Sequence, residues 1–580
     1  MKRIFSQKTI LSSIFFALFL VLCLFYFGCI SPESQFDALT KEIFIDYASH
    51  DTLTLNYTLK DPSVYDISLN KVTWGEVPVT PEDFDACKQK TKDYLVRLNE
   101  ISGLTGDRAL TYDVLKYYLE LELESYDYIY FTTNFLPMLG IQSQLPIAMA
   151  EYPFDDVQDL NDYISLLNLV DDYFSDLIAF ENAKAAAGYG MCRTALLSAI
   201  EDCKAFCADI GQNMLIEVFP EKLNALHLTD NEKQAYIKEN ASAIKSSVLP
   251  AYKNVIEALT KQLDTAPESG SLSSYKNGSN YYAYLLKAAV GTDKTAEDLI
   301  ALTEGNLIKD FTRIGEILLQ SETSEDSFLN PAYISSDPIE ILKHFKDTLT
   351  AKQFPKAPAV SCALKTVHPS IAESLSPAMY IIPRIDDMQT NQIYLNLTGS
   401  DASNELMPTL AHEGYPGHMY QTTYYYNTNP NPIRTIYEND GYVEGWATYV
   451  EGLSYDYCGL NSNVAEFTRL FNLEITLNLF CRLDLGIHYE NWTLEDAYAF
   501  ASQYLNVDKS AFSSLYTNVL LQPANYLIYG IGMEEILELQ ENQEKHLGTD
   551  FDASEFHKQL LDIGPAPFPI VKKYTNIAID

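Results

Sequence analysis

Hydrophobic residues recur at intervals of three and four over most of this chain, which is the spacing of helices that bury one face. The segments Glu82–Ile101 and Asp159–Ala187 show this period clearly. A third segment begins at Thr295, with Glu297 and Asp298 in its first turn, which is typical of a helix start. The pattern therefore predicts a mainly α protein.

The middle of the chain has a different pattern. Ala378–Asp387 and Asn391–Gly399 are short, rich in Ile and Tyr, and bounded by turn residues. They predict two strands, joined as a hairpin around residues 386–391. The helical period then returns to the C-terminus, so the predicted fold is large and helical with a small β-sheet.

The N-terminus predicts export. Lys2, Arg3 and Lys8 precede an apolar run at residues 14–27, and Gly28 then stands before Cys29. This order is typical of a bacterial lipoprotein signal, in which Cys29 is lipidated, although the aromatic residues before Gly28 depart from the usual pattern. An uncleaved signal anchor is the alternative. We divide the chain into a signal segment (1–29), a helical N-terminal region (30–330) and one continuous catalytic region (331–580).

Charge narrows the classes of partner. The chain has 580 residues, with 40 basic against 79 acidic side chains and a formal net charge of −39. This balance argues against a nucleic-acid partner, because phosphate contacts need a basic patch. It also argues against electrostatic docking on anionic lipid. An acidic surface that aids solubility explains the charge, and a preference for cationic substrates is the alternative.

The candidate chemistry lies in the segment "LAHEGYPGHMYQ", where His412 and Glu413 are followed by His418 in an H-E-x-x-x-x-H arrangement. Six residues along a straight α-helix place two side chains about 120° apart, so the two imidazoles would not share a metal. Pro416 and Gly417 favour a bend between them, which would return His418 to the same side. In the alternative, His418 begins a second helix and His412 is a satisfied core histidine.

A zinc site of this kind needs a third protein ligand and an open position for water. Glu444, 26 residues after His418, is the best candidate, and zinc is the expected cofactor, one ion per chain. Glu451 lies two helical turns further on and is expected to support a ligand from behind, with Asp440 a weaker candidate. Zinc lowers the pKa of its bound water to about 7, and Glu413 would accept the proton as general base.

These motifs carry a resemblance. "HEGYPGH" followed by "YVEGWATYVEG" resembles the bacterial family known as domain of unknown function 885, whose members are considered zinc peptidases. Further resemblance extends over most of the chain after the signal, in the segments Tyr281–Gly305, Asp484–Ala497, Gln522–Gly532 and Phe551–Pro569.

The family in turn resembles helical zinc peptidases of the oligopeptidase and carboxypeptidase type. That resemblance implies His412, His418 and Glu444 as ligands and Glu413 as catalytic base. It also implies that Tyr529 stabilises the oxyanion, with a packing tyrosine as the alternative. His488 matches a family histidine and would bind substrate or product; a structural histidine is the alternative.

The expected function is therefore an extracytoplasmic, membrane-anchored zinc peptidase that hydrolyses short peptides. The strand at Asn391–Gly399 is expected to pair through its edge with an extended substrate, unless it lies inside the sheet. A non-catalytic peptide-binding lipoprotein and a metal-dependent hydrolase of another amide or ester are the alternatives. Oligomeric state and the position of cleavage are left open by the sequence.

Overall fold

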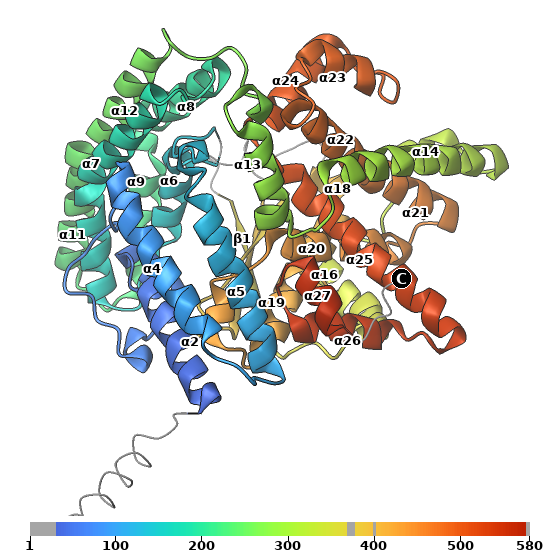
Figure 1. Ribbon diagram of the computed structural model, residues 1–580, viewed down its shortest axis with the longest axis horizontal. Coiled ribbons are helices and arrows are strands. Elements are labelled where there is room, and N and C mark those ends of the chain that lie inside the picture. Colours follow the sequence, from blue (N-terminus) through green and yellow to red (C-terminus); the bar gives the residue numbers. More distant parts are fainter. Residues whose placement is uncertain (1–30, 138, 368–376, 398–401, 576–580) are drawn as a thin grey trace, which may run out of the picture.

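The computed structural model describes residues 31–137, 139–367, 377–397 and 402–575. It is mainly helical with a small sheet, which confirms the predicted fold class (Figure 1). The signal segment and Cys29 lie outside the described residues. Among the helices of the described residues, none is both long enough and apolar enough to cross a membrane. The division at residue 330 stays a prediction.

The N-terminal helices gather on one side of the molecule, coloured blue to green in Figure 1. Both helices predicted there are confirmed, as α4 and α7. A capping box begins α7: Asp156 accepts from the Asp159 backbone N–H, and Asp159 accepts in return from that of Asp156. The helices are α2 (Pro32–Ala48), α3 (Thr52–Thr58), α4 (Pro81–Asn99), α5 (Asp107–Ser125), α6 (Ile141–Glu151), α7 (Val157–Ala186), α8 (Arg193–Cys207), α9 (Met214–Glu217), α10 (Phe219–Lys222), α11 (Asp230–Ala243) and α12 (Leu249–Gln262).

A second group of helices connects this region to the sheet. Thr295 caps α14 as predicted, because its hydroxyl accepts from the Asp298 backbone N–H while Asp298 accepts from that of Thr295. The helices are α13 (Gly278–Leu285), α14 (Ala296–Gln320), α15 (Glu325–Leu329), α16 (Pro338–Phe345) and α17 (Ala351–Gln353).

The sheet has three strands in the order β1-β3-β2. β2 (Ala378–Ile381) and β3 (Thr390–Leu395) pair antiparallel, which confirms the predicted hairpin. β1 (Ser361–Thr366) pairs parallel with the other side of β3. β3 is hydrogen-bonded on both sides, so the expected pairing of a substrate with its edge is wrong and the alternative of an internal strand is confirmed. Among the described residues, β1 and β2 are the two edge strands.

The C-terminal helices follow the sheet, and among them α20 packs closely against α25. A Cβ on Gly445 would lie 2.3 Å from the backbone carbon of Gly532, so a larger residue would push these helices apart. The helices are α18 (Ala402–Glu413), α19 (His418–Asn427), α20 (Asp440–Ser454), α21 (Ser462–Thr468), α22 (Thr476–His488), α23 (Leu494–Ala501), α24 (Lys509–Leu521), α25 (Asn525–Leu547), α26 (Ala553–Ile563) and α27 (Phe568–Tyr574).

Asp484 is a fully buried carboxyl group in α22, and it gives stability a specific pH dependence. It accepts from the Tyr282 hydroxyl at 2.5 Å and from the Ala524 backbone N–H at 2.9 Å, yet burial raises its pKa to about 8. The folded chain therefore holds a proton here that the unfolded chain releases above pH 4. The stabilising contribution of this proton is fully present below pH 4 and is lost as pH rises towards 8.

We expect Asp484→Asn to remove this dependence, because the amide keeps the shape of the side chain without titrating. The stability of the wild type relative to the variant should fall between pH 5 and 8, by roughly 1.4 kcal/mol for each pH unit. Thermal unfolding of both proteins at several pH values measures this difference in stability. Stability differences that stay constant across this range would contradict the assignment.

Candidate metal centre

The segment between the two histidines breaks the helix, as predicted from Pro416 and Gly417. α18 ends at Glu413 and α19 begins at His418, and the peptide bond between Tyr415 and Pro416 is cis. A Cβ on Gly417 would lie 1.6 Å from the carbonyl oxygen of His412, so only glycine fits this turn. The Gly417 backbone N–H donates to the Ala411 carbonyl at 2.9 Å, which keeps the start of α19 against the end of α18.

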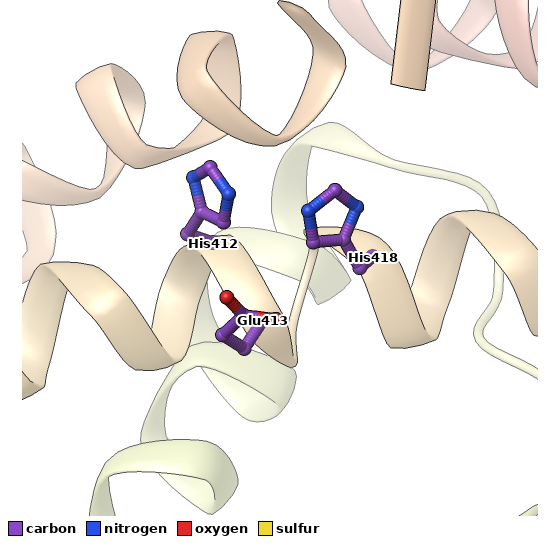
Figure 2. A group of neighbouring side chains, drawn as sticks. All are labelled: His412, Glu413 and His418. Carbon is purple, nitrogen blue, oxygen red and sulfur yellow. The ribbon is translucent and has the colours of Figure 1, made fainter. Parts of the chain in front are cut away.

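The bend places both imidazoles on the same side. Figure 2 shows His412 in the last turn of one helix and His418 at the start of the next, with the rings side by side. The ring centroids are 4.8 Å apart and the planes are nearly perpendicular, at 82°. Ligand-type atoms of these two residues and of Glu413 all lie within 4.8 Å of one another.

Glu444 lies well within 4.8 Å of both imidazoles. Its Oε2 atom is 3.4 Å from His412 Nε2 and 3.3 Å from His418 Nε2. Ligand atoms about 2.0–2.1 Å from a tetrahedral zinc ion are separated by roughly 3.3–3.4 Å, the edge of that tetrahedron. The two separations from Glu444 match two edges of this tetrahedron, so the histidines and Glu444 suit a zinc ion as a donor set, and Glu413 lies beside them.

Glu451 supports His412 from behind, at the position that helical spacing predicts. Its Oε2 atom lies 3.1 Å from His412 Nδ1. A proton on Nδ1 donated to this carboxylate leaves the Nε2 lone pair directed towards Glu444 and the candidate metal position. This is the carboxylate–histidine pairing that commonly orients metal-binding imidazoles.

The electrostatics of the cluster favour a positive charge. Burial alone would lower the pKa of His412, but hydrogen bonds to Glu444 and Glu451, together with the charge of Glu413, raise it well above its usual value. Against its own burial, the two imidazoles hold the pKa of Glu444 far below the usual range. A divalent cation would satisfy these carboxylates in place of imidazole protons.

Glu413 is oriented by the sheet. Its Oε2 atom accepts from the backbone N–H of Tyr380 at 2.8 Å. This N–H points away from β3, so Glu413 contacts the outer edge of β2. The sequence did not predict this contact, which joins residues 33 positions apart.

The cluster opens into a cavity of about 330 Å³, which is within the size range of small-molecule sites. Tyr529 lines it, with its ring centroid 6.4 Å from that of His412. Sequence reasoning missed Glu438, another lining carboxyl, whose pKa is raised to about 7 by burial and by the charge of Asp440. Nothing in its sequence context sets Glu438 apart from the many other acidic residues.

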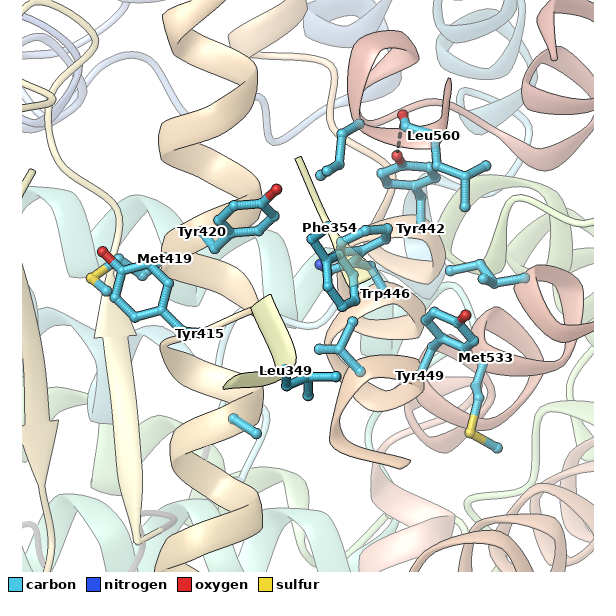
Figure 3. Packing of buried hydrophobic residues seen from close by; sticks show 14 of the residues in the cluster. Leu349, Phe354, Tyr415, Met419, Tyr420, Tyr442, Trp446, Tyr449, Met533 and Leu560 are labelled. Atoms are coloured by element: carbon cyan, nitrogen blue, oxygen red, sulfur yellow. Dashed lines mark hydrogen bonds between the residues drawn. The ribbon is translucent and has the colours of Figure 1, made fainter. Parts of the chain in front are cut away.

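Trp446, in the E-G-W-A motif, ties the ligand helix α20 to the break between the histidines. Its side chain is fully buried, and its indole N–H donates to the carbonyl oxygen of Pro416 at 3.0 Å. Figure 3 shows it surrounded by aromatic neighbours, among them Phe354 and Tyr442, the latter bonded to the Leu560 carbonyl. This core fixes Glu444 relative to both histidines.

Two predicted residues lie away from the histidines. Asp440 stands one turn before Glu444 and faces a neighbouring cavity. His488 is fully buried; its Nδ1 accepts from the Leu272 backbone N–H at 3.3 Å and its Nε2 lies 3.1 Å from the Val519 carbonyl. Burial lowers the pKa of His488 to about 4. This buried, hydrogen-bonded position fits the alternative of a structural histidine.

The protein is therefore mainly helical, and His412, His418 and Glu444 form a candidate centre for one metal ion. The chain belongs to the family described as "Bacterial protein of unknown function (DUF885)", whose model matches residues 73–574. This confirms the family resemblance carried by the His-Glu and E-G-W-A motifs. No curated protein matches the chain.

Solved structures share this fold. The chain is similar to a "putative lipoprotein" from Colwellia psychrerythraea, at 20% identity and a TM-score of 0.82, over 94% of this chain and 99% of the other. It is also similar to a "putative lipoprotein of unknown function" from Shewanella oneidensis, at 16% identity and a TM-score of 0.63, with the same coverage. At these identities the comparison shows the fold alone.

Proposed function

We propose that this protein is a zinc-dependent peptidase that hydrolyses short peptides. The observation that carries the proposal is the pair of separations from Glu444 to His412 and His418, which match two edges of a zinc tetrahedron, with Glu413 beside both histidines. A bound zinc ion would supply a Lewis acid and a water molecule acidic enough to lose its proton near neutral pH.

Each of the neighbouring side chains then has a task. Glu413 accepts the proton of the attacking water and passes it to the leaving amine, while the Tyr380 N–H keeps the carboxylate in place. Tyr529 lines the same cavity, and its hydroxyl donates a hydrogen bond to the oxyanion that forms at the scissile carbonyl. Burial raises the pKa of Tyr529, which keeps this hydroxyl protonated.

The edge of β2 that faces away from β3 offers a way to hold an extended substrate. The N–H and C=O of one residue in an antiparallel strand point to the same side, so the Tyr380 carbonyl also faces away from β3. Met379 and Ile382 flank it and line the cavity. A peptide N–H that donates to this carbonyl would lie beside Glu413, in the manner of an added strand.

A library of short peptides with mass-spectrometric detection tests the proposal. We expect cleavage by the zinc-loaded protein, loss of cleavage with a chelator, and recovery when zinc is restored. Cleavage that persists in a metal-free sample would overturn the mechanism. Peptide binding without cleavage would favour the non-catalytic lipoprotein, and turnover of esters or other amides alone would favour a different hydrolase.

We further propose that the protein is held at the outer face of a membrane by a lipid on Cys29. The basic residues at the N-terminus, the apolar run and the Gly28–Cys29 pair support this. Labelled fatty acid should enter the wild type and not Cys29→Ser; equal labelling of the two would exclude this anchor.

A further inference from the structure

A second cavity, of about 420 Å³, lies between the N-terminal helices and α25. Five aromatic residues line it, together with aliphatic ones that include Ile528 of α25; the aromatic residues are Tyr130, Phe131, Tyr189, Tyr275 and Tyr281. The metal chemistry described above uses none of these residues.

The aromatic wall is already assembled without a ligand. Phe131 and Tyr281 stack with ring centroids 4.3 Å apart and planes at 18°, and Tyr189 meets Phe131 edge-on at 5.2 Å. Tyr275 donates its hydroxyl to the Gly190 carbonyl at 3.0 Å. Rings fixed in this way lose little conformational freedom when an apolar group packs against them.

The one lysine that lines the cavity does not offer a free charge. The Lys184 ammonium donates to the Thr132 carbonyl at 2.8 Å and to the Thr133 hydroxyl at 2.6 Å, and Glu181 lies 3.4 Å away. The Lys184 ammonium therefore already has hydrogen-bond partners in the loop that contains Thr132 and Thr133. The cavity is suited to an apolar group rather than to an anion.

The cavity adjoins the candidate metal centre along two helices. On α20, Asp440 lines the apolar cavity and Glu444 lines the metal cavity. On α25, Asn525 lines the apolar cavity and Tyr529 lines the metal cavity. Each pair is four residues apart, which is about 6 Å along an α-helix.

We propose that this apolar cavity is a specificity subsite for a bulky aromatic or aliphatic side chain of the peptide substrate. This inference rests on the proposed peptidase function and names the substrate class. An extended peptide advances about 3.4 Å per residue, so the favoured side chain lies about two residues from the scissile bond. A pocket of this kind selects a large apolar side chain over alanine by about 10- to 100-fold.

Matched peptides test this subsite in two ways. Hexapeptides that carry Phe or Ala, scanned over two positions on each side of the cleaved bond, give kcat/KM with the zinc-loaded wild type. The same peptides titrated into zinc-loaded Glu413→Gln give Kd by calorimetry, without turnover. We expect Phe to be favoured over Ala at one position in both measurements, by about 10- to 100-fold.

Two substitutions connect the preference to this cavity. Ala289 lines it, and Ala289→Trp should fill the space and abolish the preference for Phe. Phe131→Ala removes the centre of the aromatic stack and should weaken the preference. Ala499→Trp, at an exposed position of α23, is the matched control and should retain it. Circular dichroism and thermal unfolding verify that each variant is folded.

The outcomes separate the subsite from the peptidase function. Cleavage with no preference for a bulky apolar residue, or a preference unchanged in folded Ala289→Trp and Phe131→Ala, would overturn the subsite and leave the peptidase standing. A binding preference lost in both variants, with no cleavage by the wild type, would support the subsite and overturn the peptidase. Absence of any peptide binding would overturn the subsite.

Discussion

Glu413→Gln is expected to lower kcat/KM for peptide hydrolysis by about 10²–10⁴-fold, the range that general-base catalysis contributes, while zinc content stays at the wild-type level. Glutamine has nearly the same shape, and its carbonyl oxygen can still accept from the Tyr380 N–H. It cannot take up a proton from water. The substitution therefore removes the proton acceptor and leaves the three candidate ligands, His412, His418 and Glu444, unchanged.

Peptide cleavage and elemental analysis, made on the same zinc-loaded preparations, measure the two halves of this prediction. Glu541→Gln is a matched control, because Glu541 pairs with Lys545 on the exposed end of α25. It should resemble the wild type in both measurements. Hydrolysis by Glu413→Gln at the wild-type rate would show that another group accepts the proton.

Glu444→Ala is expected to lose the metal. The carboxylate is the donor that lies within 3.4 Å of both imidazoles, and its removal leaves two histidines without a third ligand at tetrahedral spacing. Loss of a residue that only supports a ligand commonly costs 10- to 100-fold in metal affinity, so loss of the ligand itself should cost at least about 10²-fold.

Zinc per chain after dialysis, together with a competition titration against a chelator, measures this loss. Glu541→Ala should keep the wild-type zinc content. A melting temperature taken without zinc separates metal loss from unfolding. Full zinc retention by folded Glu444→Ala would exclude Glu444 as a ligand and would move attention to Glu413, which lies within 4.8 Å of both histidines.

Local sequence patterns predicted most of the elements that position the candidate ligands. Helical periodicity and the Thr295 cap identified long helices, and turn residues identified the β2–β3 hairpin. The bend at Pro416 and Gly417 followed from the restricted backbone of proline and the free backbone of glycine. The two-turn spacing of Glu444 and Glu451 placed both on one face of α20.

Features that depend on distant parts of the chain were not accessible in this way. β1 contributes no alternating apolar pattern, so its pairing with β3 was missed, and the sequence left open whether β3 is an edge strand or an internal one. His488 looked available for substrate, because one sequence does not show which polar residues are buried. Glu438 reaches the cavity through tertiary folding alone.

The contact between Gly445 and Gly532 has a consequence for any attempt to shorten this protein. The His-Glu and E-G-W-A motifs span only 412–447, yet the helix that carries Glu444 is seated against α25, more than 70 residues further along the chain. A fragment that stops before α25 would expose that glycine seam to solvent and lose the partner that holds α20 in register. The geometry of the candidate metal centre therefore depends on α25 as well as on the motifs, and a fragment limited to residues 412–447 would not keep it.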